Sequence, residues 1–321
     1  MTVQTQHSGI RSVQAPKANW PNFFIVGAAK CGTTSLWAHL KKHPQVFFPE
    51  MKEPHFFMTR GPRPENAHKF EHLHCVGNQQ KYLGLYEQAE SYPAIGDASI
   101  TYLWDENAPK KIHEVAPHAR IVIMLRDPVV RAHSHYLMNL RLGAESLSTF
   151  AEALRADLAT EDNGFWGGRL YVGLGLYYEQ VRRYIETFGS DQVLILLFDD
   201  LTRQPKETLA RVTQHLGIDP LELDEAEVSE AHNVYKMPRF AGAYRFATRV
   251  IAPDLRKRLL PESVKKWLQS GSLLYNTSKP PLDPESRRLL QGIFDPDIAK
   301  LEQLLGRKLP ELRKSWAAEA K

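Results

Sequence analysis

The sequence has few cysteines, little net charge and no long apolar segment. Its 2 cysteines, Cys31 and Cys75, are too few for a disulfide scaffold and favour a reducing compartment. The 41 basic and 37 acidic residues give a formal net charge of +4, which is too small to indicate nucleic-acid binding. No apolar stretch is long enough to span a membrane, and residues 1–20 are polar, without the apolar core of a secretion signal. We therefore expect a cytoplasmic protein with no transmembrane segment and no nucleic-acid partner.

The composition is that of an ordinary globular protein. Hydrophobic residues make up 43% of the 321 residues and charged residues 24%, and this length can bury one large core. No internal repeat or low-complexity linker divides the chain. We expect a single domain over residues 21–310, with a disordered N-terminal tail over residues 1–20 and a C-terminal tail over residues 311–321. The sequence predicts no particular oligomeric state.

A glycine-containing loop follows the first apolar segment. Residues 23–26 (FFIV) suit a strand buried on both faces, Gly27 and Gly32 bracket a turn, and an amphipathic helix begins at Thr33. Unpaired backbone N–H groups and the helix dipole attract anions at such a helix start, and Lys30 adds a full positive charge. The segment therefore predicts a phosphate or sulfate site. The residues expected to bind the anion are Lys30, Cys31, Gly32, Thr33, Thr34 and Ser35.

The position of the lysine separates this loop from that of nucleotide triphosphatases. Their pattern, G-x-x-x-x-G-K-[ST], has the lysine directly after the second glycine, whereas here Lys30 precedes Gly32 by two residues. One alternative is a strand-to-helix turn without a ligand, because glycine is common at such turns. Another is a P-loop kinase, in which Asp199 and Asp200, after the apolar run 192–198, would bind magnesium.

Three further runs occur downstream of the loop. Residues 52–57 read KEPHFF, and residues 126–134 read RDPVVRAHS after the apolar run 120–125. Residues 276–279 read NTSK. With the K-x-G-T-T of residues 30–34, these runs resemble the sulfotransferases that use 3′-phosphoadenosine 5′-phosphosulfate (PAPS), in particular the heparan sulfate glucosaminyl N- and O-sulfotransferases. The resemblance extends from about residue 23 to about residue 309.

The resemblance implies a fold and a co-substrate. The implied fold is an α/β, P-loop-like, three-layer fold with a mainly parallel central sheet covered by helices, which agrees with the alternation of apolar strand and helix patterns along the chain. The implied reaction is transfer of a sulfuryl group from PAPS to a hydroxyl or amine, without a metal. A nucleotide-binding module that has lost this activity is a non-enzymatic alternative, and the presence of both Lys30 and Glu53 argues against it.

The resemblance also assigns roles to individual residues. Glu53 would be the general base, and Lys30 would stabilise the leaving phosphate. Apart from the resemblance, His55 is the next candidate for the base, because it lies two residues from Glu53 and histidine ordinarily titrates near neutral pH. Arg126 and Ser134 would hold the 3′-phosphate. The loop that closes over the nucleotide would consist of Asn276, Thr277, Ser278 and Lys279.

Other segments bear on the acceptor and on metals. Ala98 stands where the heparan sulfate enzymes have a lysine, which argues against a polysaccharide acceptor and leaves carbohydrate, lipid and other small-molecule acceptors open. Residues 165–168 (FWGG) are a candidate rim of the acceptor site, and the basic segment 236–266 is expected to be a surface helix. One cluster contains potential metal ligands: His68, His72, His74 and Cys75. We expect no metal site there, because the spacing of the cluster does not match a zinc pattern. Helices are expected over residues 170–188 and 283–305, the second interrupted at Asp295-Pro296.

Overall fold

The computed structural model describes residues 19–59, 75–160, 169–221, 237–238, 275–276 and 279–319. At its centre lies a 5-stranded sheet of order β2-β3-β1-β4-β5, in which neighbouring strands are parallel. The strands are β1 (Phe23–Gly27), β2 (Val46–Phe47), β3 (Ala94–Asp97), β4 (Arg120–Leu125) and β5 (Val193–Leu197). The predicted α/β fold with a mainly parallel sheet is confirmed.

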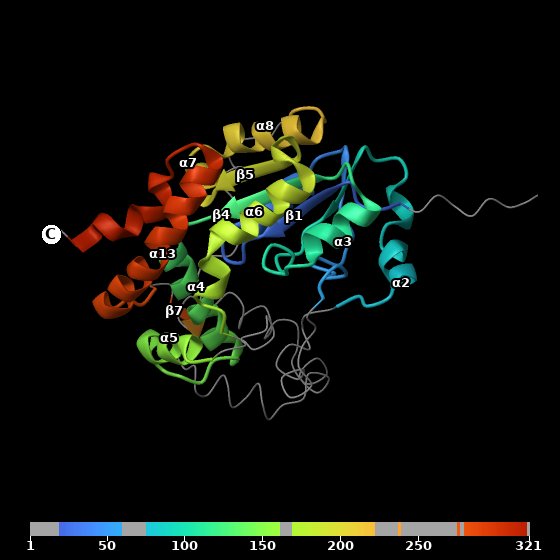
Figure 1. The fold of residues 1–321 in the computed structure, drawn as a ribbon. Coiled ribbons are helices and arrows are strands. Elements are labelled where there is room, and N and C mark those ends of the chain that lie inside the picture. The colour runs from blue at the N-terminus through green and yellow to red at the C-terminus, as the bar shows by residue number, and fades with distance from the viewer. Residues whose placement is uncertain are drawn as a thin grey trace, which may run out of the picture.

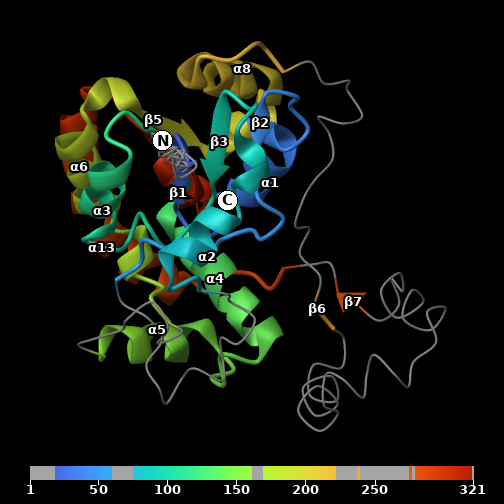
Figure 2. The ribbon, with the colours of Figure 1, turned by 90° about the vertical axis from the view of Figure 1, so that its right-hand side faces the viewer.

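Helices cover both faces of the sheet. Figure 2 shows α3 (Ala108–Val115) and α6 (Tyr177–Phe188) on one side of the strands and α1 (Thr33–Leu40) on the other. Because both faces are covered, β1 and β4 consist almost entirely of buried apolar residues. The other helices, several of them visible in Figure 1, are α2 (Gln79–Gly84), α4 (Pro128–Leu142), α5 (Phe150–Leu158), α7 (Phe198–Arg203), α8 (Pro205–Leu216) and α13 (Pro284–Leu305).

The parallel register brings several loops to one edge of the sheet. Phe24 of β1 is level with Asp97 of β3 and with Ile121 of β4, and Leu125 of β4 is level with Leu197 of β5. The segments that follow β1, β2, β3 and β4 therefore leave the sheet at the same edge. In open parallel sheets, ligands bind at this edge.

Two helices differ from their sequence-based predictions. The segment before α6 forms a short 3-10 turn (Gly173–Gly175), and α6 begins only at Tyr177, whose N–H donates to Asp297 Oδ2 (2.7 Å). The predicted interruption of α13 is wrong, because the helix continues through Pro296. Packing explains the continuity: α13 buries an apolar stripe made up of Leu290, Phe294, Ile298 and Leu301.

Some predictions fall outside the described residues. These include the candidate acceptor rim at residues 165–168 and most of the basic segment 236–266. From the latter only β6 (Met237–Pro238) is described, and it pairs antiparallel with β7 (Tyr275–Asn276). The domain boundaries remain predictions. No helix among the described residues is both long and apolar enough to cross a membrane.

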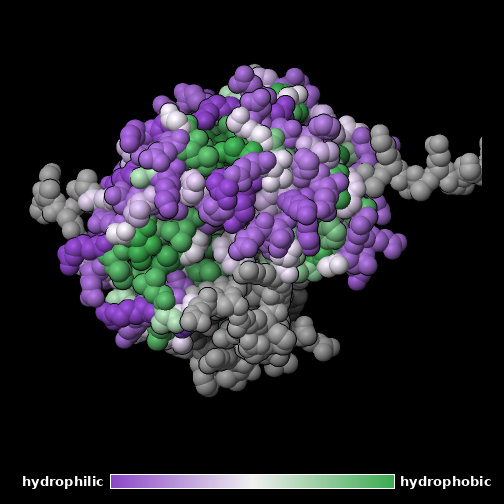
Figure 3. All heavy atoms as spheres, viewed as in Figure 1, coloured by the Kyte–Doolittle hydropathy of each residue, from purple (hydrophilic) through white to green (hydrophobic). Residues whose placement is uncertain are grey.

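The face seen in Figure 3 is largely hydrophilic, with apolar side chains gathered over the region of α13 and α4. Three leucines on helices of the described chain are markedly exposed: Leu142, Leu158 and Leu289. Single exposed leucines of this kind are ordinary on a protein surface.

Candidate active site

The loop between β1 and α1, called here the glycine loop (residues 27–34), has the backbone of an anion-binding turn. Lys30 and Gly32 both have left-handed φ values, 70° and 90°. A Cβ atom on Gly32 would lie 2.8 Å from the Phe198 ring, so both conformation and space require glycine there. Gly32 is the N-cap of α1 and has no side chain. The first N–H groups of the helix therefore point toward the loop without a capping side chain as acceptor.

Positive charges surround the glycine loop. Burial and nearby cations lower the pKa of Lys30 to about 8. The cations that contribute are Arg141, Arg126, Lys279 and Arg131. Arg126 Nη1 donates to the Lys30 carbonyl (3.4 Å), and its guanidinium lies 4.2 Å from the centroid of the Phe198 ring. This concentration of charge suits a ligand with several negative charges.

Two buried groups behind Lys30 add to this site. Arg131 is fully buried, and its Nη2 donates to the Tyr171 carbonyl. Within the described part of the chain its Nε and Nη1 have no hydrogen-bond partner. Burial, with Arg131 and Lys30 nearby, holds the pKa of His135 well below its usual value, so this imidazole is neutral. Because Arg131 is fully buried, it adds to the positive potential at Lys30 instead of offering a direct contact to a ligand.

Glu53 lies in an unusual turn after β2, called here the Glu53 turn (residues 52–57). Glu53 and His55 have φ values of 59° and 54°, which side chains with a Cβ rarely adopt. One carboxylate oxygen of Glu53 contacts the Lys52 ammonium, and Oε2 lies 3.8 Å from His55 Nε2. The Glu53 side chain is 18% exposed, so the carboxylate is oriented by its neighbours yet reachable from outside.

His55 is held from the loop that follows β3. Its backbone N–H donates to Ser99 Oγ (3.1 Å), and its Nδ1 lies 2.8 Å from Thr101 Oγ1. Burial lowers the pKa of His55 to about 4, although the neighbouring Glu53 charge opposes this shift. The imidazole is therefore neutral at neutral pH and a weak base. The His55 side chain is only 1% exposed, whereas that of Glu53 is 18% exposed, so Glu53 is the group that an acceptor can reach.

The structure places most of the predicted site residues at one edge of the sheet. Lys30, Glu53 and Arg126 follow β1, β2 and β4. Lys279 lies near Arg126: burial lowers the pKa of Lys279, and the Arg126 guanidinium lowers it further. Ser134 is half-buried on α4, where its neighbours Arg131 and His135 also lie. Asn276 contributes backbone to β7, whereas Thr277 and Ser278 lie outside the described residues.

The residues after Lys30 differ in their surroundings. Cys31 is fully buried; its N–H donates to the Ala28 carbonyl (3.2 Å), and its Sγ lies 3.6 Å from the Tyr177 hydroxyl. Cys31 therefore shapes the back of the glycine loop instead of offering a side chain to a ligand. Thr33 is buried, whereas Thr34 and Ser35 are half-buried in the first turn of α1.

Sequence reasoning did not assign several residues of this site. Met138 Sδ lies 3.4 Å from Lys30 Nζ, and Asp97, Ser99 and Thr101 support the Glu53 turn from β3 and the loop after it. The local signal for the last three is a group of polar residues at the end of a buried strand, at the edge where ligands bind, whereas Met138 lies within α4 and has no such signal. That signal does not identify the partner of each side chain.

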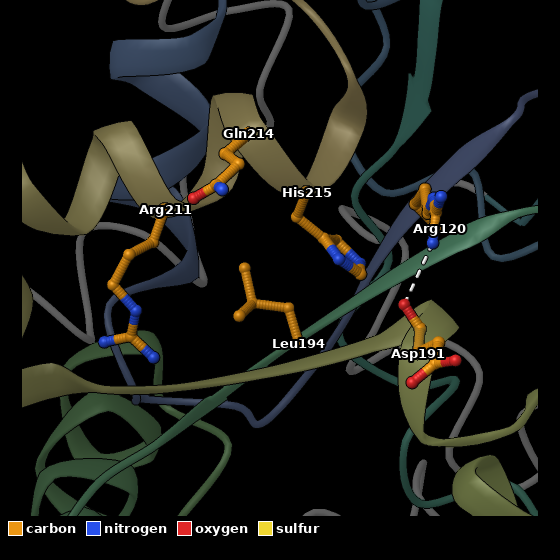
Figure 4. Close-up of a pocket in the computed structure, with 6 residues that line it drawn as sticks. All are labelled: Arg120, Asp191, Leu194, Arg211, Gln214 and His215. Carbon is orange, nitrogen blue, oxygen red and sulfur yellow. Dashed lines mark hydrogen bonds between the residues drawn. The ribbon is translucent and has the colours of Figure 1, made fainter.

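A separate hollow lies at the opposite end of the sheet, where β4 and β5 begin. Its volume is about 380 Å³, and Figure 4 shows the residues that line it: Arg120, Asp191, Leu194, Arg211, Gln214 and His215. Arg120 Nη1 donates to the Asp191 carbonyl (2.9 Å), and Arg211 Nη2 donates to the Ile195 carbonyl (3.5 Å). Both guanidinium groups are thus engaged by the protein, and the hollow is separate from the glycine loop.

No group of three or more potential metal ligands occurs within the described ranges. Of the cluster His68, His72, His74 and Cys75, for which no metal was predicted, only Cys75 belongs to those ranges, and it is exposed.

Comparison with known proteins identifies the family. The sulfotransferase family pattern matches residues 21–222. Mouse carbohydrate sulfotransferase 15 is 29% identical over 268 residues, covering 68% of this chain and 46% of that protein. Mouse bifunctional heparan sulfate N-deacetylase/N-sulfotransferase 4 is 23% identical, covering 97% of this chain and 33% of that protein. The chain thus spans less than half the length of these curated relatives.

A solved structure agrees with this assignment. The crystal structure of a sulfotransferase from Alicyclobacillus acidocaldarius superposes with a TM-score of 0.65 at 29% identity, covering 92% of this chain and 99% of that one. The family pattern over residues 21–222 spans the five strands of the sheet, the glycine loop and the Glu53 turn. The chain belongs to the sulfotransferase family.

Proposed function

We propose that this protein transfers a sulfuryl group from PAPS to a hydroxyl or amine of a carbohydrate acceptor. The observation that carries the proposal is the position of a cationic, uncapped glycine loop at the same sheet edge as the carboxylate of Glu53. The name of a curated relative, carbohydrate sulfotransferase 15, supports the acceptor class, whereas Ala98 weighs against a polysaccharide such as heparan sulfate. Lipid and other small-molecule hydroxyls are the alternatives that a transfer assay would distinguish.

In the proposed reaction, PAPS supplies the sulfuryl group, and adenosine 3′,5′-bisphosphate is the leaving group. Glu53 accepts the proton of the acceptor atom, which forms a bond to sulfur as the bond between sulfur and the bridging phosphate oxygen breaks. The ammonium of Lys30 stabilises the negative charge that develops on that oxygen. The proton on Glu53 then passes to solvent, which restores the carboxylate. Arg126 and Ser134 hold the 3′-phosphate, and residues 276–279 close over the nucleotide.

The surroundings of Asp199 and Asp200 weigh against the kinase alternative. Asp199 Oδ2 lies 2.6 Å from Lys314 Nζ, and Asp200 Oδ2 lies 3.6 Å from Arg211 Nη1. Both carboxylates are thus neutralised by cations of the chain, whereas a magnesium ligand of a kinase has to face the nucleotide.

We also propose a cytoplasmic location, because both cysteines are free. Fractionation of the source cells would check this location.

The proposed role of Glu53 is tested with Glu53→Gln. Labelled PAPS is incubated with a panel of unsulfated glycans with free amines or hydroxyls, glycolipids and other small hydroxyl compounds, and products are identified by mass spectrometry. We expect Glu53→Gln to lower turnover of the accepted substrate by roughly 10²–10⁴ and to leave nucleotide affinity unchanged, because a general base acts in the transition state.

Glu50→Gln is the matched control, since Glu50 lies three positions upstream and its side chain is 97% exposed. It should have wild-type turnover. Wild-type turnover in Glu53→Gln would show that another group is the base, and absence of transfer to every compound in the panel would contradict the proposed function.

A further inference from the structure

The Glu53 turn is attached at alternate residues to the segment that follows β3. His55 N–H donates to Ser99 Oγ (3.1 Å), and Phe57 N–H donates to the Tyr102 hydroxyl (3.4 Å). Just beyond the turn, Thr59 N–H donates to Asp105 Oδ2 (2.6 Å). Three backbone donors of this segment are therefore bound by side chains of a different loop.

Asp97 lies behind two of these three acceptors. It is the last residue of β3, and its carboxylate is fully buried. Oδ1 accepts a hydrogen bond from Ser99 Oγ (2.7 Å), and Oδ2 accepts one from the Tyr102 hydroxyl (2.9 Å). The Tyr82 hydroxyl donates to Oδ2 as well (2.8 Å).

This arrangement fixes the direction of two hydroxyl groups. A hydroxyl has a single proton, so when Ser99 and Tyr102 donate to Asp97, their oxygens are left to accept from the backbone of the Glu53 turn. A carboxylate only accepts hydrogen bonds and therefore enforces this direction. An amide at the same place would donate its N–H to one of the two hydroxyls. The proton of that hydroxyl would then point toward a backbone N–H of the Glu53 turn, so that two donors would face each other.

The turn needs support of this kind. Glu53 and His55 both have a left-handed φ, a conformation that persists only where surrounding groups impose it. We propose that Asp97 is a positioning residue for the general base: through the hydroxyls of Ser99 and Tyr102 it holds the Glu53 turn in the conformation that presents the Glu53 carboxylate. This inference rests on the proposed role of Glu53.

A role in fold stability alone does not account for Asp97. Burial raises its pKa to about 6, with the Glu53 charge adding to the increase and the three hydroxyl donors opposing it. Because the pKa in the folded protein lies above the ordinary value of 3.8, ionisation of Asp97 makes the fold less stable as pH rises through this range. Ionisation of Asp97 therefore costs stability at neutral pH, which a purely structural role would not require.

The first test replaces Asp97 by asparagine and measures turnover and nucleotide binding separately. Asp97→Asn should lower kcat by roughly 10–100-fold while the affinity for adenosine 3′,5′-bisphosphate stays unchanged, because a displaced base slows the chemical step and the glycine loop is untouched. Glu302→Gln is the matched control: Glu302 is a buried carboxylate that accepts from Leu309 N–H (2.8 Å) on α13. It should lower the melting temperature and leave kcat unchanged.

A double variant tests whether Asp97 acts through Glu53. Adding Asp97→Asn to Glu53→Gln should cause little further loss of kcat, because the base that it positions is already absent. Additive losses of kcat in the double variant would overturn the inference. It would also be overturned if Asp97→Asn had wild-type kcat while Glu53→Gln was impaired. Wild-type kcat in Glu53→Gln itself would instead show that the proposed base is wrong, and the inference would fall with it.

A spectroscopic readout needs no acceptor. The pKa of the His55 imidazole, about 4 because of burial, is set also by the Glu53 and Lys52 charges and can be followed by NMR. In Asp97→Asn it should rise toward 6.5 as the turn loosens and admits water, and in Glu302→Gln it should not. If Asp97→Asn does not fold, Ser99→Ala, which removes one bridging hydroxyl, should give the same shift to a smaller extent. An unchanged His55 pKa in the folded variant would overturn the inference.

Discussion

The ammonium group of Lys30 is surrounded by other positive charges, and this has a consequence for nucleotide binding. Its pKa of about 8 means that roughly half of the Lys30 side chains are protonated at pH 8 in the free protein. A bound phosphate would favour the charged form and raise this pKa. Binding of adenosine 3′,5′-bisphosphate at pH 8 should therefore be coupled to the uptake of about half a proton, and at pH 6 to almost none from this group.

Calorimetry in two buffers of different ionisation enthalpy at each pH measures this proton uptake. Lys30→Arg is the control, because arginine stays protonated throughout the range and should remove the pH 8 uptake. Equal uptake in the wild-type protein and in Lys30→Arg would show that Lys30 does not titrate on binding.

Arg126 should contribute more to nucleotide affinity than any arginine at the other end of the sheet. Arg126→Ala should weaken binding of adenosine 3′,5′-bisphosphate by about 2–4 kcal/mol, because a desolvated phosphate would lose its charged partner. Arg211→Ala, at the hollow where β5 begins, should bind the nucleotide as the wild-type protein does. Titration calorimetry distinguishes the two; equal affinities would place the phosphate elsewhere.

At the residue scale, the sequence predicts what is encoded locally. Lys30, Glu53 and Arg126 lie in short runs, K-x-G-T-T, KEPHFF and RDP, whose resemblance to sulfotransferase motifs identified them. The role of Asp97 could not be found in this way. It depends on hydrogen bonds between segments that meet only in the folded sheet, and His55 and Ser99 are 44 positions apart.

At the element scale, the start of α6 is capped by a carboxylate from another helix. Asp297 Oδ2 on α13 accepts from the N–H groups of Tyr177 (2.7 Å) and Tyr178 (3.1 Å). The sequence could not indicate this start, because the capping residue lies 120 positions later in the chain. For the same reason the packing of α13, which lets it continue through Pro296, was not evident from the local pattern.

Loss of this cap should lower stability. Asp297→Ala should reduce the free energy of unfolding by about 1 kcal/mol, the usual contribution of a side-chain N-cap, measured by urea denaturation. Asp295→Ala is the matched control on the same helix, because Asp295 is 59% exposed and, among the described residues, forms an ion pair with Arg313 alone. Its effect should stay below about 0.5 kcal/mol. Equal losses in the two variants would show that the contact with α6 is not stabilising.

At the scale of the whole molecule, the strand order decides which loops meet. Alternating apolar strands and helices predicted a parallel sheet, but not that β1 lies between β3 and β4. This order places the segments after β1, β3 and β4 beside one another at the carboxyl edge, and the segment after β2 joins them beside β3. The anion site and the Glu53 turn thus share one edge because of topology, which local sequence patterns do not determine.

Nucleotide binding at this edge should stabilise the whole domain. Adenosine 3′,5′-bisphosphate at 100 times its Kd should add about 2.7 kcal/mol to the free energy of unfolding and raise the melting temperature by roughly 5 °C, because the ligand binds only the folded chain. The shift should be the same with and without magnesium, and ATP at equal concentration should give a much smaller one, since it has no 3′-phosphate for Arg126. Differential scanning calorimetry of the wild-type protein and of Arg126→Ala measures both effects, and the variant should show little shift at the same concentration. A larger shift with ATP that requires magnesium would contradict the sulfotransferase proposal and favour a kinase.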